Sequence, residues 1–168
     1  MLATTFLRKQ HREVLGRLKA APKTKDATRA RELMEEISQQ LRIHTALEEE
    51  IFYPAVRAAT GSTVLADHSL CDHAYAKDLI AQIDEMAPGD ARYDALVVAL
   101  CAHVVPHMNE EQAGVFQFVR QAGLDTATLG RQMAQRQKTL REDVTLFGLP
   151  HVNAGALTWP MACRVVMA

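Results

Sequence analysis

The sequence predicts an all-α protein: an antiparallel up-down-up-down four-helix bundle with an additional C-terminal helix and an apolar irregular tail. Three observations lead to this fold class. Gly and Pro are sparse over the first 140 residues, whereas helix-forming Ala, Leu, Glu, Gln and Arg are plentiful. Four long segments repeat apolar residues at helical spacing. Short polar links join these segments, and short links favour antiparallel neighbours.

The four bundle helices are expected at residues 4–20, 27–57, 63–86 and 90–121. Thr4 or Thr5 is a suitable cap for the first helix, and Pro54 is expected to interrupt the second. The turn signal Pro88-Gly89-Asp90 separates the last two helices. Pro106 lies inside the fourth helix, where a kink or a bulge is expected.

The C-terminal quarter of the chain differs in kind from the bundle. Asp125 or Thr126 can cap a fifth, mostly polar helix that ends near residue 143. The following residues, 144–168, carry a single charge and are broken by Gly and Pro, so they are interpreted as an irregular apolar tail. We therefore expect a bundle over residues 1–122 and, over residues 123–168, a helix and tail that pack on the bundle or on a partner. A homodimer formed through the tail follows from the second arrangement.

Length, charge and cysteine content narrow the class of protein. A chain of 168 residues is long enough for one ordinary domain. Its net charge of −1 argues against nucleic-acid binding and against a polybasic membrane patch. No apolar run approaches the roughly 20 residues that span a bilayer. Three cysteines without a CxxC pair argue against a disulfide framework and favour a cytoplasmic location.

The apolar faces of the four helices contain histidine and glutamate where Leu or Ile is expected. His44 and Glu48 lie one turn apart on the second helix, and His107 and Glu111 repeat this spacing on the fourth. Single histidines occupy apolar positions on the other two helices. Buried unpaired charge is costly, and a metal ion would neutralise it. The predicted metal ligands are His11, His44, Glu48, His73, His107 and Glu111.

Each of these signals has an ordinary structural explanation when taken alone. A single His-x-x-x-Glu is more often a surface ion pair, and a lone histidine on an apolar face is more often a core residue with a backbone partner. Their joint occurrence on all four faces favours a metal centre. Four imidazoles and two carboxylates suit a pair of first-row metal ions inside a bundle.

Helical phase, taken as about 100° per residue, separates other candidates from this set. Glu49 and Glu50 fall away from the face of His44, so they should be solvated, and the cysteines are expected to be small packing residues. His103 lies one turn before His107 on the same face. It is either a seventh ligand, a group that hydrogen-bonds a ligand or the substrate or transfers a proton, or a buried histidine with a backbone partner.

Two motifs carry a resemblance to a known family. His44-Thr-Ala-Leu-Glu48-Glu49 followed by Ile51-Phe52-Tyr53-Pro54, and His107-Met-Asn-Glu110-Glu111 followed by Val115-Phe116, are similar to the second- and fourth-helix signatures of the hemerythrin-like HHE cation-binding family. His11 and His73 match its single histidines, so the resemblance covers roughly residues 3–122. The invertebrate oxygen carriers hold a further histidine where this chain has Lys77, so the chain resembles the bacterial six-ligand members.

The resemblance implies a cofactor of two iron ions with an oxo or hydroxo bridge. It also implies binding of, or reaction with, a small oxidant such as O2, H2O2 or NO, and catalase-like peroxide dismutation is one such reaction. Whether the chain is an enzyme is left open. The alternative is a sensor or an O2-carrying module without turnover, and a third hypothesis is a metal store without redox chemistry.

Overall fold

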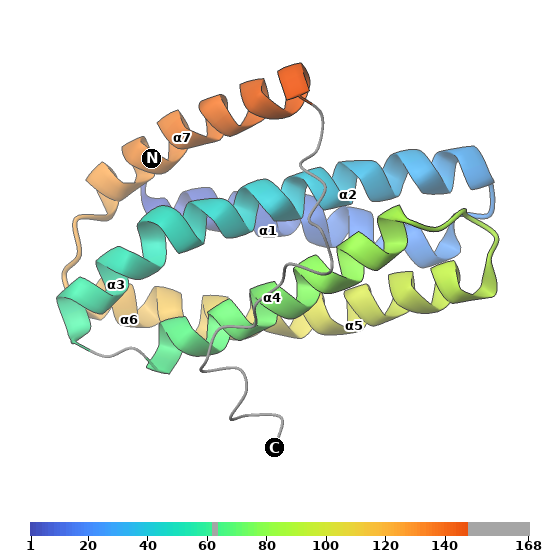
Figure 1. Cartoon of the computed structure of the whole chain (residues 1–168). Helices are drawn as coiled ribbons and strands as arrows, with labels where there is room; N and C mark the ends of the chain where they lie inside the picture. Colours follow the sequence, from blue (N-terminus) through green and yellow to red (C-terminus); the bar gives the residue numbers. More distant parts are fainter. Residues whose placement is uncertain (62–63, 148–168) are drawn as a thin grey trace.

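The structure is a computed structural model that describes residues 1–61 and 64–147. Long helices lie side by side as four rods, and a further helix lies against one side of them (Figure 1). The predicted all-α bundle with an additional C-terminal helix is therefore confirmed. Residues 148–168, most of the predicted apolar tail, lie outside the described residues. Among the described helices, none is both long and apolar enough to cross a membrane.

The rods follow the chain in order. Helix α1 (Ala3–Ala20) and the short 3₁₀ turn η1 (Ala21–Lys23) form the first rod. Helix α2 (Ala27–Leu47), the π-helical turn η2 (Glu48–Phe52) and α3 (Tyr53–Thr60) form the second. Helix α4 (Val64–Asp84) is the third, and α5 (Ala91–Ala113) continues into α6 (Val115–Gln121) as the fourth. Helix α7 (Thr126–Phe147) packs against α1 and α2 (Figure 1).

Aspartate side chains begin three of the helices. Asp26 accepts a hydrogen bond from the Arg29 backbone N–H at 2.7 Å at the start of α2, and Asp90 does the same for Arg92 at the start of α5. Asp125, as predicted, caps α7 by accepting from the Thr128 N–H at 3.0 Å. The expected threonine cap of α1 is wrong, because the N-cap position is Leu2, which provides no side-chain hydrogen bond.

The second rod is irregular just before Pro54 rather than at it. In η2 the Tyr53 N–H donates to the carbonyl oxygen of Glu48, five residues earlier. Proline has no N–H, and its ring crowds the carbonyl four residues earlier, so the wide π turn relieves a clash that a regular helix would suffer. In the fourth rod α5 remains α-helical through Pro106, and the break lies at Gly114.

Two apolar clusters fill the bundle and leave a polar layer between them. Along α1, Leu7 belongs to one cluster and Val14 to the other, and His11 lies between them. Along α2, Leu41 and Leu47 flank His44 in the same way. The polar layer is thus closed at both ends by packed hydrocarbon, which positions it at mid-bundle and shields it from water.

Candidate metal centre

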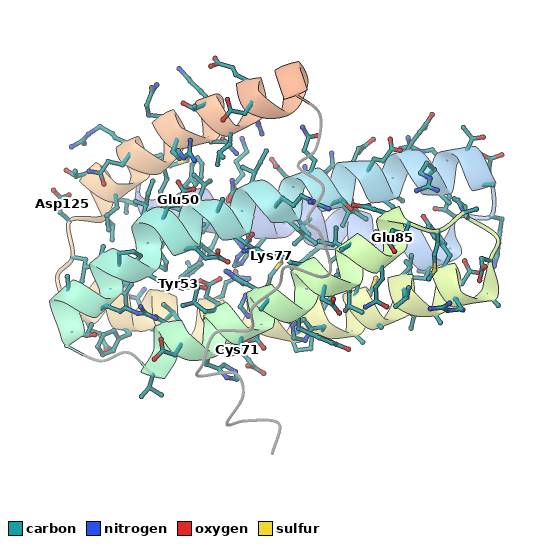
Figure 2. The ribbon with its side chains drawn as sticks, viewed as in Figure 1. Glu50, Tyr53, Cys71, Lys77, Glu85 and Asp125 are labelled. Atoms are coloured by element: carbon teal, nitrogen blue, oxygen red, sulfur yellow. The ribbon has the colours of Figure 1, made fainter. Side chains whose placement is uncertain are left out.

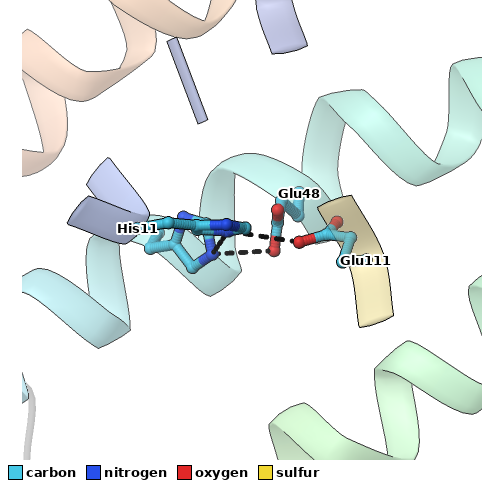
Figure 3. A group of neighbouring side chains, drawn as sticks. His11, Glu48 and Glu111 are labelled. Carbon is cyan, nitrogen blue, oxygen red and sulfur yellow. Dashed lines mark hydrogen bonds and ion pairs between the residues drawn. The ribbon is translucent and has the colours of Figure 1, made fainter. Parts of the chain in front are cut away.

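Four predicted ligands meet in the polar layer from three rods. His11 on α1, His44 on α2, Glu48 in η2 and Glu111 on α5 each offer one ligand atom, and these atoms all lie within 4.8 Å of one another. All four side chains are buried. Figure 3 shows the imidazole of His11 and the two carboxylates converging on one point.

The spacing of these atoms matches ligands of one ion. His11 Nε2 lies 3.2 Å from His44 Nε2 and 3.2 Å from Glu111 Oε2. His44 Nε2 lies 3.3 Å from Glu48 Oε2. Atoms that bind one metal ion at about 2.1 Å and at roughly tetrahedral or right angles are separated by about 3.0–3.4 Å.

The remaining two histidines lie beside this group. His73 Nε2 on α4 is 3.2 Å from Glu48 Oε2, so this one carboxylate oxygen faces imidazoles from two rods. The rings of His73 and His107 are 5.1 Å apart, edge to face. The Nε2 atoms of both histidines are buried and have no hydrogen-bond partner among the described residues. The structure therefore brings all six predicted residues into one layer, in which five are buried and His107 is partly buried.

Three of the histidines are held from behind through Nδ1. The contacts are His44 to Gln10 Oε1 at 2.9 Å, His73 to Glu49 Oε1 at 3.0 Å, and His107 to Asp72 Oδ2 at 3.0 Å. Amide and carboxylate oxygens accept hydrogen bonds, so each Nδ1–H donates and each Nε2 turns an unprotonated lone pair inward. The inward-facing Nε2 atoms and carboxylate oxygens of the layer are therefore all hydrogen-bond acceptors. A bound cation would make their close approach favourable.

The electrostatics of the layer also favour a bound cation. Burial raises the pKa of Glu48 well above its ordinary value, and the neighbouring carboxylate of Glu111 raises it further. Burial lowers the pKa of His44 well below its ordinary value, and His11 beside it adds to the effect. A metal ion reverses both penalties. Imidazole and carboxylate donors together suit first-row metals, including iron. The residues of the layer therefore fit an iron site.

The residues behind the histidines were not predicted. Glu49 was expected to be solvated, and this is wrong: its side chain is only 28% exposed, because at the start of the π turn it faces α4 and His73. Helical periodicity does not indicate a role for Gln10 or Asp72. Each of the three directly adjoins a predicted ligand in sequence yet contacts the histidine of a neighbouring rod, and this adjacency is the signal that could have found them.

His103 lies at the edge of the layer. Its Nε2–H donates to the carbonyl oxygen of Asp72 at 2.9 Å, and its ring meets the edge of Tyr75. Its side chain is 22% exposed. His103 therefore touches the backbone of the residue that holds His107, one step outside the converging atoms.

The two described cysteines are not part of the layer. Cys101 is free, and its thiol donates to the carbonyl oxygen of Leu18.

Comparison with known proteins agrees with this geometry. The family model of the hemerythrin HHE cation-binding domain matches residues 2–119. A solved structure of similar fold is that of a hemerythrin HHE cation-binding domain-containing protein from Mycobacterium kansasii. It has a TM-score of 0.73 and 20% sequence identity, and the match covers 88% of this chain and 94% of the other. No curated protein matches the chain. The chain belongs to the hemerythrin HHE cation-binding domain family.

Proposed function

We propose that this protein is a non-haem di-iron protein that binds or reacts with a small oxidant, O2, H2O2 or NO. The proposed ligands are His11, His44, Glu48, His73, His107 and Glu111. The observation that carries the proposal is the position of Glu48 Oε2, which lies 3.3 Å from His44 Nε2 and 3.2 Å from His73 Nε2. One carboxylate shared by imidazoles of two rods suits two ions side by side.

Iron in this layer supplies an Fe(II)/Fe(III) couple and a Lewis-acid position for a small molecule. The chain's own residues exclude water and hold a proton beside the layer. The apolar clusters at both ends exclude water. Tyr53 holds a proton beside Glu111, because its hydroxyl donates to Oε1 at 3.1 Å.

The size of the available space supports a small ligand. A cavity of about 10 Å³ is lined by His44, His73, His103 and His107, among other residues. This is close to the volume that one water-sized probe occupies, roughly 10–15 Å³. A diatomic molecule or peroxide suits such a space, whereas a larger organic substrate does not.

Peroxide dismutation is the reaction we favour, and reversible binding in a carrier or sensor is the second candidate. Dismutation needs proton transfer, and the Tyr53 O–H and the His103 N–H are hydrogen-bond donors beside the layer. The packed apolar walls favour reversible binding, because they limit the supply of protons to the layer. A bound oxidant that receives no proton is released unchanged.

The test uses the full chain, loaded anaerobically with Fe(II) and freed of excess metal. Elemental analysis should give two irons per chain, and a single zinc or iron per chain would overturn the proposed centre. Steady O2 release from added H2O2 would support dismutation. A stable adduct that reverses on removal of O2 would favour the carrier instead. The matched variants are Glu111→Gln, which should lose iron, and the exposed neighbour Glu110→Gln, which should retain it.

A further inference from the structure

We propose that the two metal positions are chemically unequal, and that Glu49, fixed by Lys77, is the positioning residue that makes them so. This inference rests on the proposed di-iron function. It concerns the groups that contact Nδ1 in each pair of histidines. Charged carboxylates contact His73 and His107, whereas among the described residues a neutral amide contacts His44 and no hydrogen-bonding group contacts His11.

The strongest of these supports is a three-residue chain between η2 and α4. Glu49 Oε1 accepts from His73 Nδ1–H at 3.0 Å. Lys77 Nζ donates to both oxygens of the same carboxylate, at 2.6 and 2.7 Å. Lys77 extends from α4 towards Glu49 on the second rod (Figure 2). The ammonium group therefore keeps Glu49 ionised and fixed in direction while it holds the imidazole.

Asp72 supports the second histidine on this side. Its Oδ2 accepts from His107 Nδ1–H at 3.0 Å, and the carbonyl oxygen of the same residue accepts from His103 Nε2–H at 2.9 Å. Both imidazoles of the His73/His107 pair thus donate to a carboxylate.

The His11/His44 pair has weaker support. His44 Nδ1–H donates to the neutral amide oxygen of Gln10 at 2.9 Å. His11 Nδ1 is buried and has no hydrogen-bond partner among the described side chains and backbone, and its ring stacks on Phe116 with centroids 5.6 Å apart. Among the described residues, the Nδ1 atom of neither imidazole meets a charged group.

This difference changes the metal-binding strength of the rings. A hydrogen bond to a carboxylate draws the ring proton outward and makes the opposite nitrogen a more basic ligand. Such charge-assisted bonds are about twice as strong as neutral ones. The His73/His107 position should therefore bind a divalent ion more tightly and favour the oxidised state of iron, whereas the His11/His44 position should favour the reduced state.

The test is a stepwise titration of the metal-free full chain with Co²⁺, followed by its ligand-field absorption. Glu49→Gln should weaken one of two Co²⁺ equivalents by about 10–100-fold and leave the other within a few-fold. Lys77→Met should act in the same direction, and Lys77→Arg should retain tight binding. In the iron-loaded chain, Glu49→Gln should raise the reduction potential of one iron.

Two further variants keep the result specific. Glu50→Gln is the matched control, because Glu50 adjoins Glu49 but pairs with Arg136 on α7, at 2.6 Å, away from the layer. Gln10→Glu places a carboxylate behind His44 and should bring the two equivalents closer in affinity. The proposal is overturned if Glu49→Gln weakens both equivalents equally or neither. If the unmodified chain binds fewer than two Co²⁺ ions, the proposed function itself is wrong.

Discussion

The hydroxyl of Tyr53 donates a hydrogen bond to Glu111 Oε1 at 3.1 Å and so joins the start of α3 to the end of α5 inside the polar layer. Both side chains are buried. Burial raises the pKa of Tyr53 well above its ordinary value, and the nearby carboxylates of Glu48 and Glu111 raise it further. The hydroxyl therefore remains a proton donor at neutral pH.

Replacing Tyr53 with Phe should destabilise the metal-free chain. The substitution removes a buried hydrogen bond to a carboxylate, at an expected cost of about 1.5–3 kcal/mol in the free energy of unfolding, measured with urea. Tyr93→Phe is the control, because Tyr93 is equally buried but its hydroxyl lies 3.4 Å from the carbonyl oxygen of Ala30. Equal losses in the two variants would contradict the importance of the Glu111 contact.

Replacing Glu48 with Gln should have opposite effects on the metal-free and metal-loaded chains. Both carboxylate oxygens of Glu48 are buried without a hydrogen-bond partner, so its charge opposes folding when no cation is bound. The variant should stabilise the metal-free chain by about 1–3 kcal/mol at neutral pH and lose metal affinity. Glu50→Gln should do neither.

The gain in Glu48→Gln should also depend on pH. Burial raises the pKa of Glu48 in the folded chain above its unfolded value. The neutral acid is therefore tolerated below the unfolded pKa, and stability is lost as the pH rises from there through the folded pKa. The difference in unfolding free energy between the variant and the unmodified chain should be small near pH 4 and grow towards pH 7. A constant difference over this range would contradict the assignment.

Metal binding should stabilise the fold, because the proposed ligands come from all four rods. A ligand that binds only the folded state, at 100 times its dissociation constant, adds about 2.7 kcal/mol. Thermal unfolding with and without Co²⁺ measures this gain. Glu48→Gln should show little of it, and an unchanged melting temperature in the unmodified chain would contradict metal binding by the folded layer.

Gly130 should be essential where α7 meets the N-terminus. A Cβ atom there would lie 2.1 Å from the carbonyl oxygen of Met1 and 2.9 Å from the backbone nitrogen of Ala3, so Gly130→Ala must displace backbone. The expected loss in unfolding free energy is about 1–3 kcal/mol. Gly16→Ala is the matched control, since no atom lies within 4 Å of its Cβ position, and it should stabilise α1 by about 0.5–1 kcal/mol.

The rods and the inward residues were predictable because periodicity encodes them. His44 and Glu48 lie on the apolar face of their rod. A charge buried there needs a compensating partner, and side chains on the other rods are the ones that face it. The same pattern at His107 and Glu111 identified the fourth rod. Repeated spacing therefore indicated which residues from distant parts of the chain lie in one layer.

The surrounding contacts were not predictable from that rule. A fixed angle per residue placed Glu49 in solvent, but the helix becomes a π turn at this residue. Gln10 and Asp72 serve histidines on other rods, and their contacts depend on how closely the rods approach. Periodicity within one helix contains no such information.

The π turn also absorbs one residue of the second rod. Because the Tyr53 N–H bonds to Glu48, this turn contains one residue more than a regular turn. Deleting that residue would let the turn close as a regular α-helical turn and leave the direction of the downstream side chains nearly unchanged. A single-codon deletion within the regular part of α2 would instead rotate everything downstream by about 100° and swing the phenol of Tyr53 away from the fourth rod.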